Sequence, residues 1–209
     1  MQYSSSIMTN PTLRSFTQHD SNQFIADAAK GTLPAVSFLK PGNDDGHPGY
    51  YTLAAFETFA ARAITAIQSN PKLWKSTAIF LTMDETGGYY DSGYIQPVSF
   101  FGDGPRIPMI AISPYARQGF VDHTYADHVS ILKFIEANWG LSPLTSYSAD
   151  NLPNATPGVY VPQNRPAIGD LMTLFNFKDP HFGTAKLPVH RQPRPLPAAR
   201  IPVIAVSER

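Results

Sequence analysis

Cysteine is absent from this 209-residue sequence, which excludes disulfide bonds and thiolate metal sites. An excess of charge is absent as well, because 16 Lys and Arg residues balance 16 Asp and Glu residues. Bulk charge therefore gives no indication of a nucleic-acid partner. No apolar run reaches the length of a membrane span, and the first ten residues lack the basic and apolar pattern of a signal peptide. What remains is a chain long enough to bury one core.

Apolar patterning predicts strands that alternate with helices. Short apolar, partly β-branched runs predict strands at Leu33–Leu39, Thr77–Thr82 and Ile107–Ser113. Helices are expected at four places: from Asp20 or Ser21 to Ala29 with Gly31 as the stop, Thr52–Ser69, from a capping-box-like start at Thr124 and Asp127 to Asn138, and Asn164–Phe175. Such alternation predicts an α/β fold, a mostly parallel sheet with helices on both faces.

The last part of the chain has a different composition. From Asn176 to Arg209 it carries six prolines and several arginines, and most of it lacks a periodic apolar pattern. We therefore divide the chain into a domain of residues 1–177 and an extended, poorly packed Pro/Arg-rich tail of residues 178–209. The alternative is that this tail is an arm that binds an anionic surface or a partner.

Two adjacent carboxylates, Asp84 and Glu85, stand at the C-terminal end of the Thr77–Thr82 strand, just before Gly87 and Gly88. Catalytic groups collect at such strand ends in open α/β sheets. A divalent cation, Mg²⁺, Ca²⁺ or Mn²⁺, commonly compensates paired oxygen ligands, and at least one carboxylate is then expected to face a cleft. The alternative is a turn cap at Asp84 and a solvated loop residue at Glu85.

Histidines are the other candidates for chemistry. His47 lies in a G-H-P-G loop, where it is either a ligand or oxyanion donor, or an exposed turn residue. If the first two strands are parallel, His47 falls within roughly 12 Å of the Asp84 carboxylate. His123 and His128 flank a helix start. His123 is either a phosphate contact or has no role in the site, and for His128 we favour packing against the sheet. Asp91 either bonds to a ligand of the metal and orients it, or caps a turn.

Several segments resemble a known family. They are L-P-A-V-S-F-L-K-P from Leu33, G-H-P-G-Y from Gly46, T-A-I-F-L-T-M-D-E-T-G-G-Y-Y-D from Thr77, and the run from Gly104 to Glu136. Together they resemble the bacterial phosphoesterases, which include phosphatidylcholine-type phospholipases C and metal-dependent acid phosphatases. The resemblance implies part of an alkaline-phosphatase-like core and hydrolysis of a phosphate ester, either a small molecule or a phospholipid head group.

The resemblance also implies roles for individual residues. Asp84 and Glu85 would be ligands of a divalent metal, and His47 would hydrogen-bond a phosphoryl oxygen or protonate the leaving group. His123 is a weaker candidate for the same wall of the site. The full-length family member would be secreted or periplasmic.

Two departures from the family pattern limit these expectations. The E-N pair and the hydroxyl nucleophile of the family's N-terminal half have no counterpart here, and Ser92 stands where phospholipase-like members carry His. We therefore expect the C-terminal portion of a longer enzyme or a truncated gene product, with little activity alone. A sulfatase-like hydrolase and a non-catalytic remnant or interaction module remain as alternatives.

Overall fold

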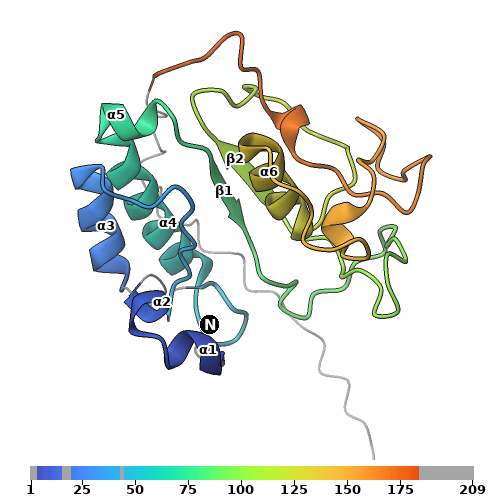
Figure 1. Ribbon diagram of the computed structural model, residues 1–209, viewed down its shortest axis with the longest axis horizontal. Coiled ribbons are helices and arrows are strands. Elements are labelled where there is room, and N and C mark those ends of the chain that lie inside the picture. The colour runs from blue at the N-terminus through green and yellow to red at the C-terminus, as the bar shows by residue number, and fades with distance from the viewer. Residues whose placement is uncertain (1–3, 16–19, 43–44, 184–209) are drawn as a thin grey trace, which may run out of the picture.

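The computed structural model describes residues 4–15, 20–42 and 45–183. Figure 1 shows a short central pair of strands, with the α-helices that precede it in the chain on one side and the α-helix that follows it on the other. Along the chain the elements are α1 (Ser5–Met8), α2 (Pro11–Ser15), α3 (Ser21–Lys30), α4 (Leu53–Gln68), α5 (Pro71–Trp74), β1 (Ile79–Thr82), β2 (Met109–Ile112), α6 (Val129–Trp139), and the 3-10 turns η1 (Ala149–Asn151) and η2 (Met172–Leu174). Within this described part, no helix is long and apolar enough to cross a membrane.

Helices α3 and α4 form where local signals place them. The Asp20 carboxylate accepts a hydrogen bond from the Gln23 backbone N–H at 2.8 Å, and Gly31 ends α3 with a left-handed φ of 74°. The Thr52 hydroxyl accepts from the Ala55 N–H at 3.2 Å and starts α4. Both helices were predicted to within a residue or two at each end, and both predictions are confirmed.

Strands β1 and β2 pair antiparallel, with Ile79 opposite Ile112 and Thr82 opposite Met109. The described residues contain only this one strand pair, so they do not confirm the predicted mostly parallel sheet. Its two faces are both covered. Ile79 and Ile112 pack on the α3–α5 side with Ala28, Ala66, Ile67 and Trp74. Phe80, Met109 and Ala111 pack on the α6 side with Phe134, Leu171 and Phe175. The predicted helical layers on both faces are therefore present (Figure 1).

The predicted strand at Leu33–Leu39 does not form, since no residue between 31 and 42 is in a strand. Pro34 lacks the N–H that a ladder requires. Phe38 is 76% exposed, which shows that an apolar residue in this segment need not be buried. Only Leu33 reaches the core beside α3 and α4.

The predicted helix at Asn164–Phe175 is also wrong, because only η2 is helical there. Distant residues take the backbone groups that a helix would use. The Gln96 side-chain amide bonds both the N–H and the carbonyl of Ala167, at 3.0 and 2.8 Å, and the Gly169 N–H donates to the Tyr125 carbonyl at 2.8 Å. Ala167, Ile168, Leu171 and Phe175 of this segment are buried without a helix around them.

The start of α6 differs from its predicted capping box. Asp127, not Thr124, caps the helix: its Oδ1 accepts from the backbone N–H groups of Val129 and Ser130, at 2.8 and 3.2 Å. The Ser130 hydroxyl accepts from the Asp127 N–H at 3.1 Å, which completes a reciprocal box. Thr124 instead donates its hydroxyl hydrogen to Asp122. The predicted end at Gly140 is confirmed, with φ at 64°.

The beginning of the predicted tail contacts the domain. The Phe182 ring lies edge-on to Tyr115, with centroids 6.1 Å apart, and the His181 N–H donates to the Pro114 carbonyl. Residues 184–209, most of the predicted tail, lie outside the described residues.

Candidate functional site

The loop Met83–Gly88, called here the acidic loop, follows β1 directly. Asp84 and Glu85 are both exposed. Gly87 and Gly88 have φ values of 66° and 80°, which only glycine adopts without strain. The Gly87 N–H donates to the Glu85 Oε2 at 2.8 Å, so the turn bends back on its own carboxylate. The sequence thus predicted correctly that the acids follow the strand and precede a sharp turn.

The side chain of Lys40 forms an ion pair with this loop. Lys40 precedes the G-H-P-G segment Gly46–Gly49, which is called here the His47 loop. Its Nζ lies 2.5 Å from the Asp84 Oδ2, and each side chain is 68% exposed. The hydrogen bond from Lys40 lowers the pKa of Asp84, and the same bond raises the pKa of Lys40. The sequence predicts no role for Lys40. It stands at the end of the predicted strand Leu33–Leu39, and nothing in that position indicates a contact with Asp84.

The His47 loop packs against the acidic loop. A Cβ on Gly87 would lie 2.8 Å from two ring carbons of Pro48, so glycine is required for this approach. His47 itself is exposed. Its Nδ1 lies 2.9 Å from the Pro48 carbonyl and its ring meets Tyr50 edge-on with centroids 5.1 Å apart. A carbonyl accepts only, so Nδ1 carries the hydrogen, and the neutral ring keeps its lone pair on Nε2.

This contact brings the two loops together without the predicted parallel strands. The residue next to His47 touches the loop that carries Asp84, although no strand precedes His47 in the described chain. The two loops therefore lie together because Pro48 packs against Gly87, and not because their preceding strands are paired. The 12 Å reach itself stays a prediction.

His128, the residue directly before α6, also contacts the acidic loop. Its Nε2 lies 2.8 Å from the carbonyl oxygen of Met83, the residue before Asp84. Sequence interpretation favoured packing against the sheet for His128, and the ring instead bonds to the loop at the end of the sheet. His123 is exposed, and its side chain makes no hydrogen bond among the described residues. The sequence feature that could have indicated a role for His128 is its position beside Asp127, directly before an apolar helix.

The residues around the acidic loop do not form a complete metal centre. In the ranges that the structure describes, no three His, Asp or Glu side chains gather closely enough to hold a metal ion. Asp84 and Glu85 have the right oxygen chemistry for a hard cation, and the ammonium group of Lys40 already neutralises one of them. The donor set therefore fits part of a divalent-metal site, with further ligands required.

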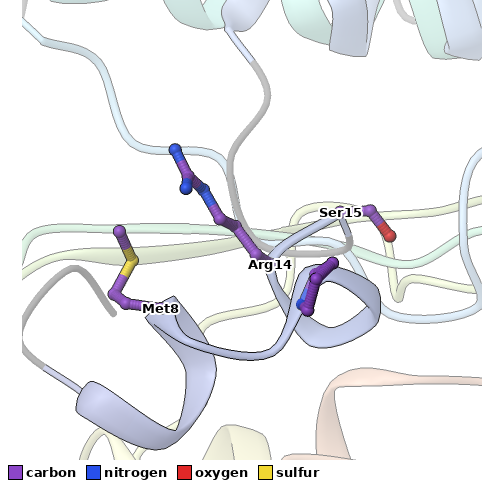
Figure 2. Close-up of a pocket in the computed structure, with 4 residues that line it drawn as sticks. Met8, Arg14 and Ser15 are labelled. Carbon is purple, nitrogen blue, oxygen red and sulfur yellow. The ribbon is translucent and has the colours of Figure 1, made fainter.

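Two hollows on the surface lie away from these side chains. Figure 2 shows the first, beside α1 and α2, with Met8, Arg14 and Ser15 around it. The second lies between α5 and Phe182. Neither contains Asp84, Glu85 or His47. The cleft that the sequence predicted for the acidic pair is not formed by either hollow.

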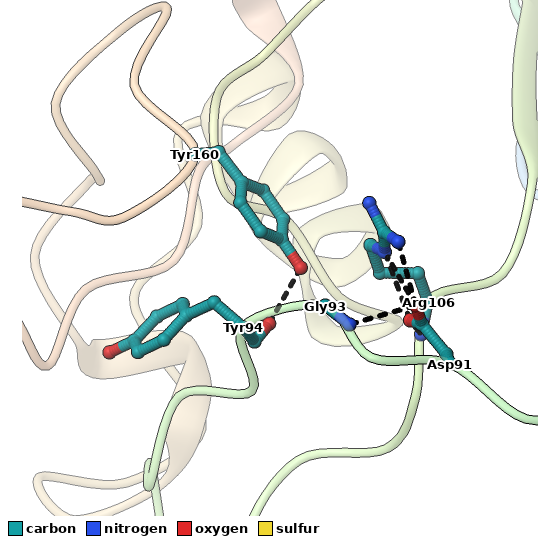
Figure 3. Close-up of polar contacts among 5 residues, drawn as sticks. All are labelled: Asp91, Gly93, Tyr94, Arg106 and Tyr160. Carbon is teal, nitrogen blue, oxygen red and sulfur yellow. Dashed lines mark hydrogen bonds and ion pairs between the residues drawn. The ribbon is translucent and has the colours of Figure 1, made fainter.

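Farther along the same connection the chain is held by a set of polar contacts that range from buried at Gln96 to exposed at Arg106. We call it the anchor network, and it consists of Asp91, Gly93, Tyr94, Gln96, Asp103, Arg106, Tyr125 and Tyr160. Figure 3 shows Arg106 forked onto Asp91, with Nη2 at 2.6 Å from Oδ1 and Nε at 2.9 Å from Oδ2. The backbone N–H groups of Gly93 and Arg106 also donate to Asp91. These bonds hold the pKa of Asp91 far below its usual range, chiefly through the Arg106 side chain.

The second half of the anchor network surrounds Gln96, which is 1% exposed. The Tyr125 hydroxyl donates to Asp103 at 2.7 Å and accepts from the Gln96 N–H at 3.0 Å. Burial, followed by the bond to Asp103, raises the pKa of Tyr125. The Tyr160 hydroxyl donates to the Tyr94 carbonyl at 2.6 Å (Figure 3). Asp91 is thus committed to Arg106 and to turn geometry, which favours the predicted turn cap over a metal partner.

Comparison with known proteins finds a family match over more than half of the chain. Residues 2–142 match the Phosphoesterase family. The chain is 33% identical over 190 residues to a non-hemolytic phospholipase C of Burkholderia pseudomallei, an alignment that covers 78% of this chain and 25% of that protein. It is 31% identical over 180 residues to a hemolytic phospholipase C of Pseudomonas aeruginosa, covering 75% of this chain and 23% of that protein.

A third relative extends the comparison to another genus. Phospholipase C B of Mycobacterium tuberculosis is 28% identical over 184 residues, with 75% of this chain and 32% of that protein covered. The chain therefore spans about a quarter to a third of the length of these relatives. Asp84, Glu85, His47, His123 and His128 all fall inside the matched residues. The chain belongs to the phosphoesterase family.

Proposed function

We propose that this chain carries the acidic part of a phosphate-ester hydrolase site, and that the ester belongs to a phospholipid head group. The observation that supports this most directly is the meeting of three separate segments at one loop. Lys40, the His47 loop and His128 all contact the loop that holds Asp84 and Glu85. The relatives named phospholipase C support the choice of a phospholipid ester.

Asp84 and Glu85 would hold a divalent metal, Mg²⁺, Ca²⁺ or Mn²⁺, together with ligands from outside the described residues. When bound, such an ion binds phosphoryl oxygens and stabilises the charge that develops on them. Lys40 would give up its bond to Asp84 to a more highly charged ion. Because both partners of that pair are exposed, the exchange costs little.

His47 would act at the wall of the same site. Its Nδ1 hydrogen is engaged by the Pro48 carbonyl, so Nε2 is the nitrogen that faces any reacting group. In the neutral ring Nε2 accepts a hydrogen bond, and in the protonated ring it donates to a phosphoryl oxygen or leaving group. His123, exposed and without a bond of its own, is the weaker candidate for this wall.

The predicted alkaline-phosphatase-like parallel core is part of the same proposal. The chain spans only a fraction of its relatives' length, and further strands would pair with the free edges of the two-stranded sheet. A nucleophile and the remaining metal ligands would come from residues outside those that the structure describes, and the whole enzyme would act outside the cytoplasm, as the resemblance implies.

Metal titration tests the acidic part directly. Isothermal titration calorimetry of the 209-residue chain with Mn²⁺ is expected to show weak binding that Asp84→Asn combined with Glu85→Gln abolishes. Lys40→Ala is expected to tighten binding, because it removes the competing cation. Equal Mn²⁺ affinity for the double variant and the unchanged chain would contradict the assignment of Asp84 and Glu85.

Activity assays test the reaction class. The 209-residue chain is expected to turn over little p-nitrophenyl phosphate or p-nitrophenylphosphorylcholine, whereas the complete protein that carries this sequence should hydrolyse them and lose activity on Asp84→Asn. Preference for p-nitrophenyl sulfate would favour the sulfatase-like alternative. A complete protein without hydrolysis would favour the non-catalytic alternative, for which the lack of a three-ligand cluster in the described residues is the supporting observation.

A further inference from the structure

The acidic loop is fastened to the rest of the molecule at its first peptide group. The carbonyl of Met83 and the N–H of Asp84 belong to one planar peptide unit. The His128 Nε2 lies 2.8 Å from that carbonyl oxygen. A hydrogen bond to this oxygen restricts rotation of the whole unit, and the rotation sets the direction in which the Asp84 side chain leaves the backbone.

Hydrogen bonds and packing hold the backbone that carries His128. The reciprocal cap between Asp127 and Ser130 fixes the backbone on both sides of His128, and Ser130 is completely buried. Farther along α6, Phe134 packs edge-on against Phe80 of β1 with ring centroids 4.9 Å apart. Helix α6 is therefore packed against strand β1, and His128 reaches across from α6 to the residue that follows β1.

The tautomer follows from the geometry. A carbonyl oxygen has no hydrogen to give, so the His128 Nε2 must carry it. This requirement is met both by the neutral ring with its hydrogen on Nε2 and by the protonated ring. A side-chain amide nitrogen at the same reach would satisfy the Met83 carbonyl equally well, which distinguishes a positioning role from a proton-transfer role.

We propose that His128 is a positioning residue for the acidic loop: its bond to the Met83 carbonyl orients Asp84 and Glu85 for cation binding. This inference rests on the proposed function for the identity of the cation, and on the structure alone for the restraint of the loop. Outer contacts of this kind typically change metal affinity 10- to 100-fold.

Hydrogen exchange measured by mass spectrometry tests the restraint without metal or activity. In the 209-residue chain, His128→Ala is expected to speed exchange in the peptide containing residues 83–88 on the order of tenfold, because loss of the bond lets the loop open. His128→Gln keeps an N–H donor at a similar reach and is expected to restore slow exchange. The matched control is His181→Ala, whose ring lies 3.9 Å from Asp179 and away from this loop.

Mn²⁺ titration of the same four proteins supplies the second measurement. The apparent dissociation constant should rise roughly tenfold in His128→Ala and return in His128→Gln, with melting temperatures close to that of the unchanged chain. Unchanged exchange of residues 83–88 in His128→Ala would overturn the inference, as would a failure of His128→Gln to restore it. If no protein binds Mn²⁺ but the exchange pattern holds, the metal proposal fails and the positioning role of His128 stands.

Discussion

Asp84 and Asp91 lie in the same connection between β1 and β2, and each is paired with a cation, yet their surroundings differ. Asp84 contacts one long lysine, and both side chains are 68% exposed. The Asp91 side chain is 13% exposed and receives the forked guanidinium of Arg106, whose side chain is 59% exposed, together with two backbone N–H groups (Figure 3). A single lysine therefore holds Asp84, whereas several hydrogen bonds hold Asp91.

The difference shows how one connection serves two purposes. A planar guanidinium that meets a carboxylate in two bonds gives a specific geometry, while a lysine ammonium acts as a point charge on a flexible stem. An exposed Lys–Asp pair is screened by water and salt. The anchor network can thus hold the connection in place while the acidic loop keeps its carboxylates open to an incoming cation.

The largest effect is expected inside the anchor network. Gln96→Leu leaves the buried N–H and carbonyl of Ala167 without partners, and each unpaired group costs about 1–3 kcal/mol. We expect the free energy of unfolding to fall by about 2–6 kcal/mol in urea titrations. The control Gln23→Leu, at an exposed position of α3, should change it by at most about 0.5 kcal/mol. Equal losses of stability in Gln96→Leu and Gln23→Leu would contradict the structural role of the buried Gln96 amide.

Gly87→Ala is expected to have the next largest effect. A positive φ costs a non-glycine residue about 1–2 kcal/mol, and the new Cβ would also collide with the Pro48 ring at 2.8 Å. Gly88→Ala is the matched control, because its φ is positive but no atom lies within 4 Å of the new Cβ. Thermal melts should therefore show a larger loss for Gly87→Ala. The difference between the two variants measures the contact between the His47 loop and the acidic loop.

The pH dependence of stability should separate Asp91 from Asp84. Arg106 lowers the pKa of Asp91, so the folded state binds fewer protons than the unfolded state. The stability from this group is complete above the ordinary aspartate value of 3.8 and is lost as the pH falls below it. Thermal melts between pH 7 and pH 2 should show the gap between the unchanged chain and Asp91→Asn closing in acid. For Asp84→Asn the same sign but a much smaller gap is expected, since the Lys40–Asp84 pair is exposed.

The smallest effect is expected for Lys40→Ala. An exposed ion pair contributes at most about 1 kcal/mol, and salt screens it further. Urea titrations at low and high NaCl concentration should give a small loss that shrinks as salt rises. A loss comparable with that of Gln96→Leu, or one that persists in high salt, would show that the acidic loop is anchored by Lys40 and not merely neutralised by it.

Prediction from sequence succeeded where neighbouring residues supply the cause. Asp20 and Thr52 cap α3 and α4 because a short side chain reaches an N–H three residues ahead. Gly31 and Gly140 end helices because glycine adopts a positive φ. The acidic pair follows β1 because strand and turn signals are adjacent in the chain. The roles of Asp84, Glu85, His47 and His123 in a metal site remain predictions.

Prediction failed where the partner lies far along the chain. The sequence of residues 164–175 predicts a helix, but the Ala167 carbonyl accepts from the Gln96 side chain and the Gly169 N–H donates to the Tyr125 carbonyl. The Leu33–Leu39 run looks like a strand, but it finds no strand to pair with among the described residues. The sequence offered no signal that Arg106 would engage Asp91, or that Lys40 and His128 would meet at the acidic loop.

The sequence by itself determined the helices α3 and α4, the apolar strands β1 and β2, and the placement of two acids at a strand end, because hydrophobic period, capping and glycine turns act over a few residues. Only the tertiary structure decided that β1 and β2 run antiparallel, that Asp91 is an anchor, and that Lys40, Pro48 and His128 converge on the acidic loop. These outcomes depend on which surfaces pack together, and packing is a property of the whole chain.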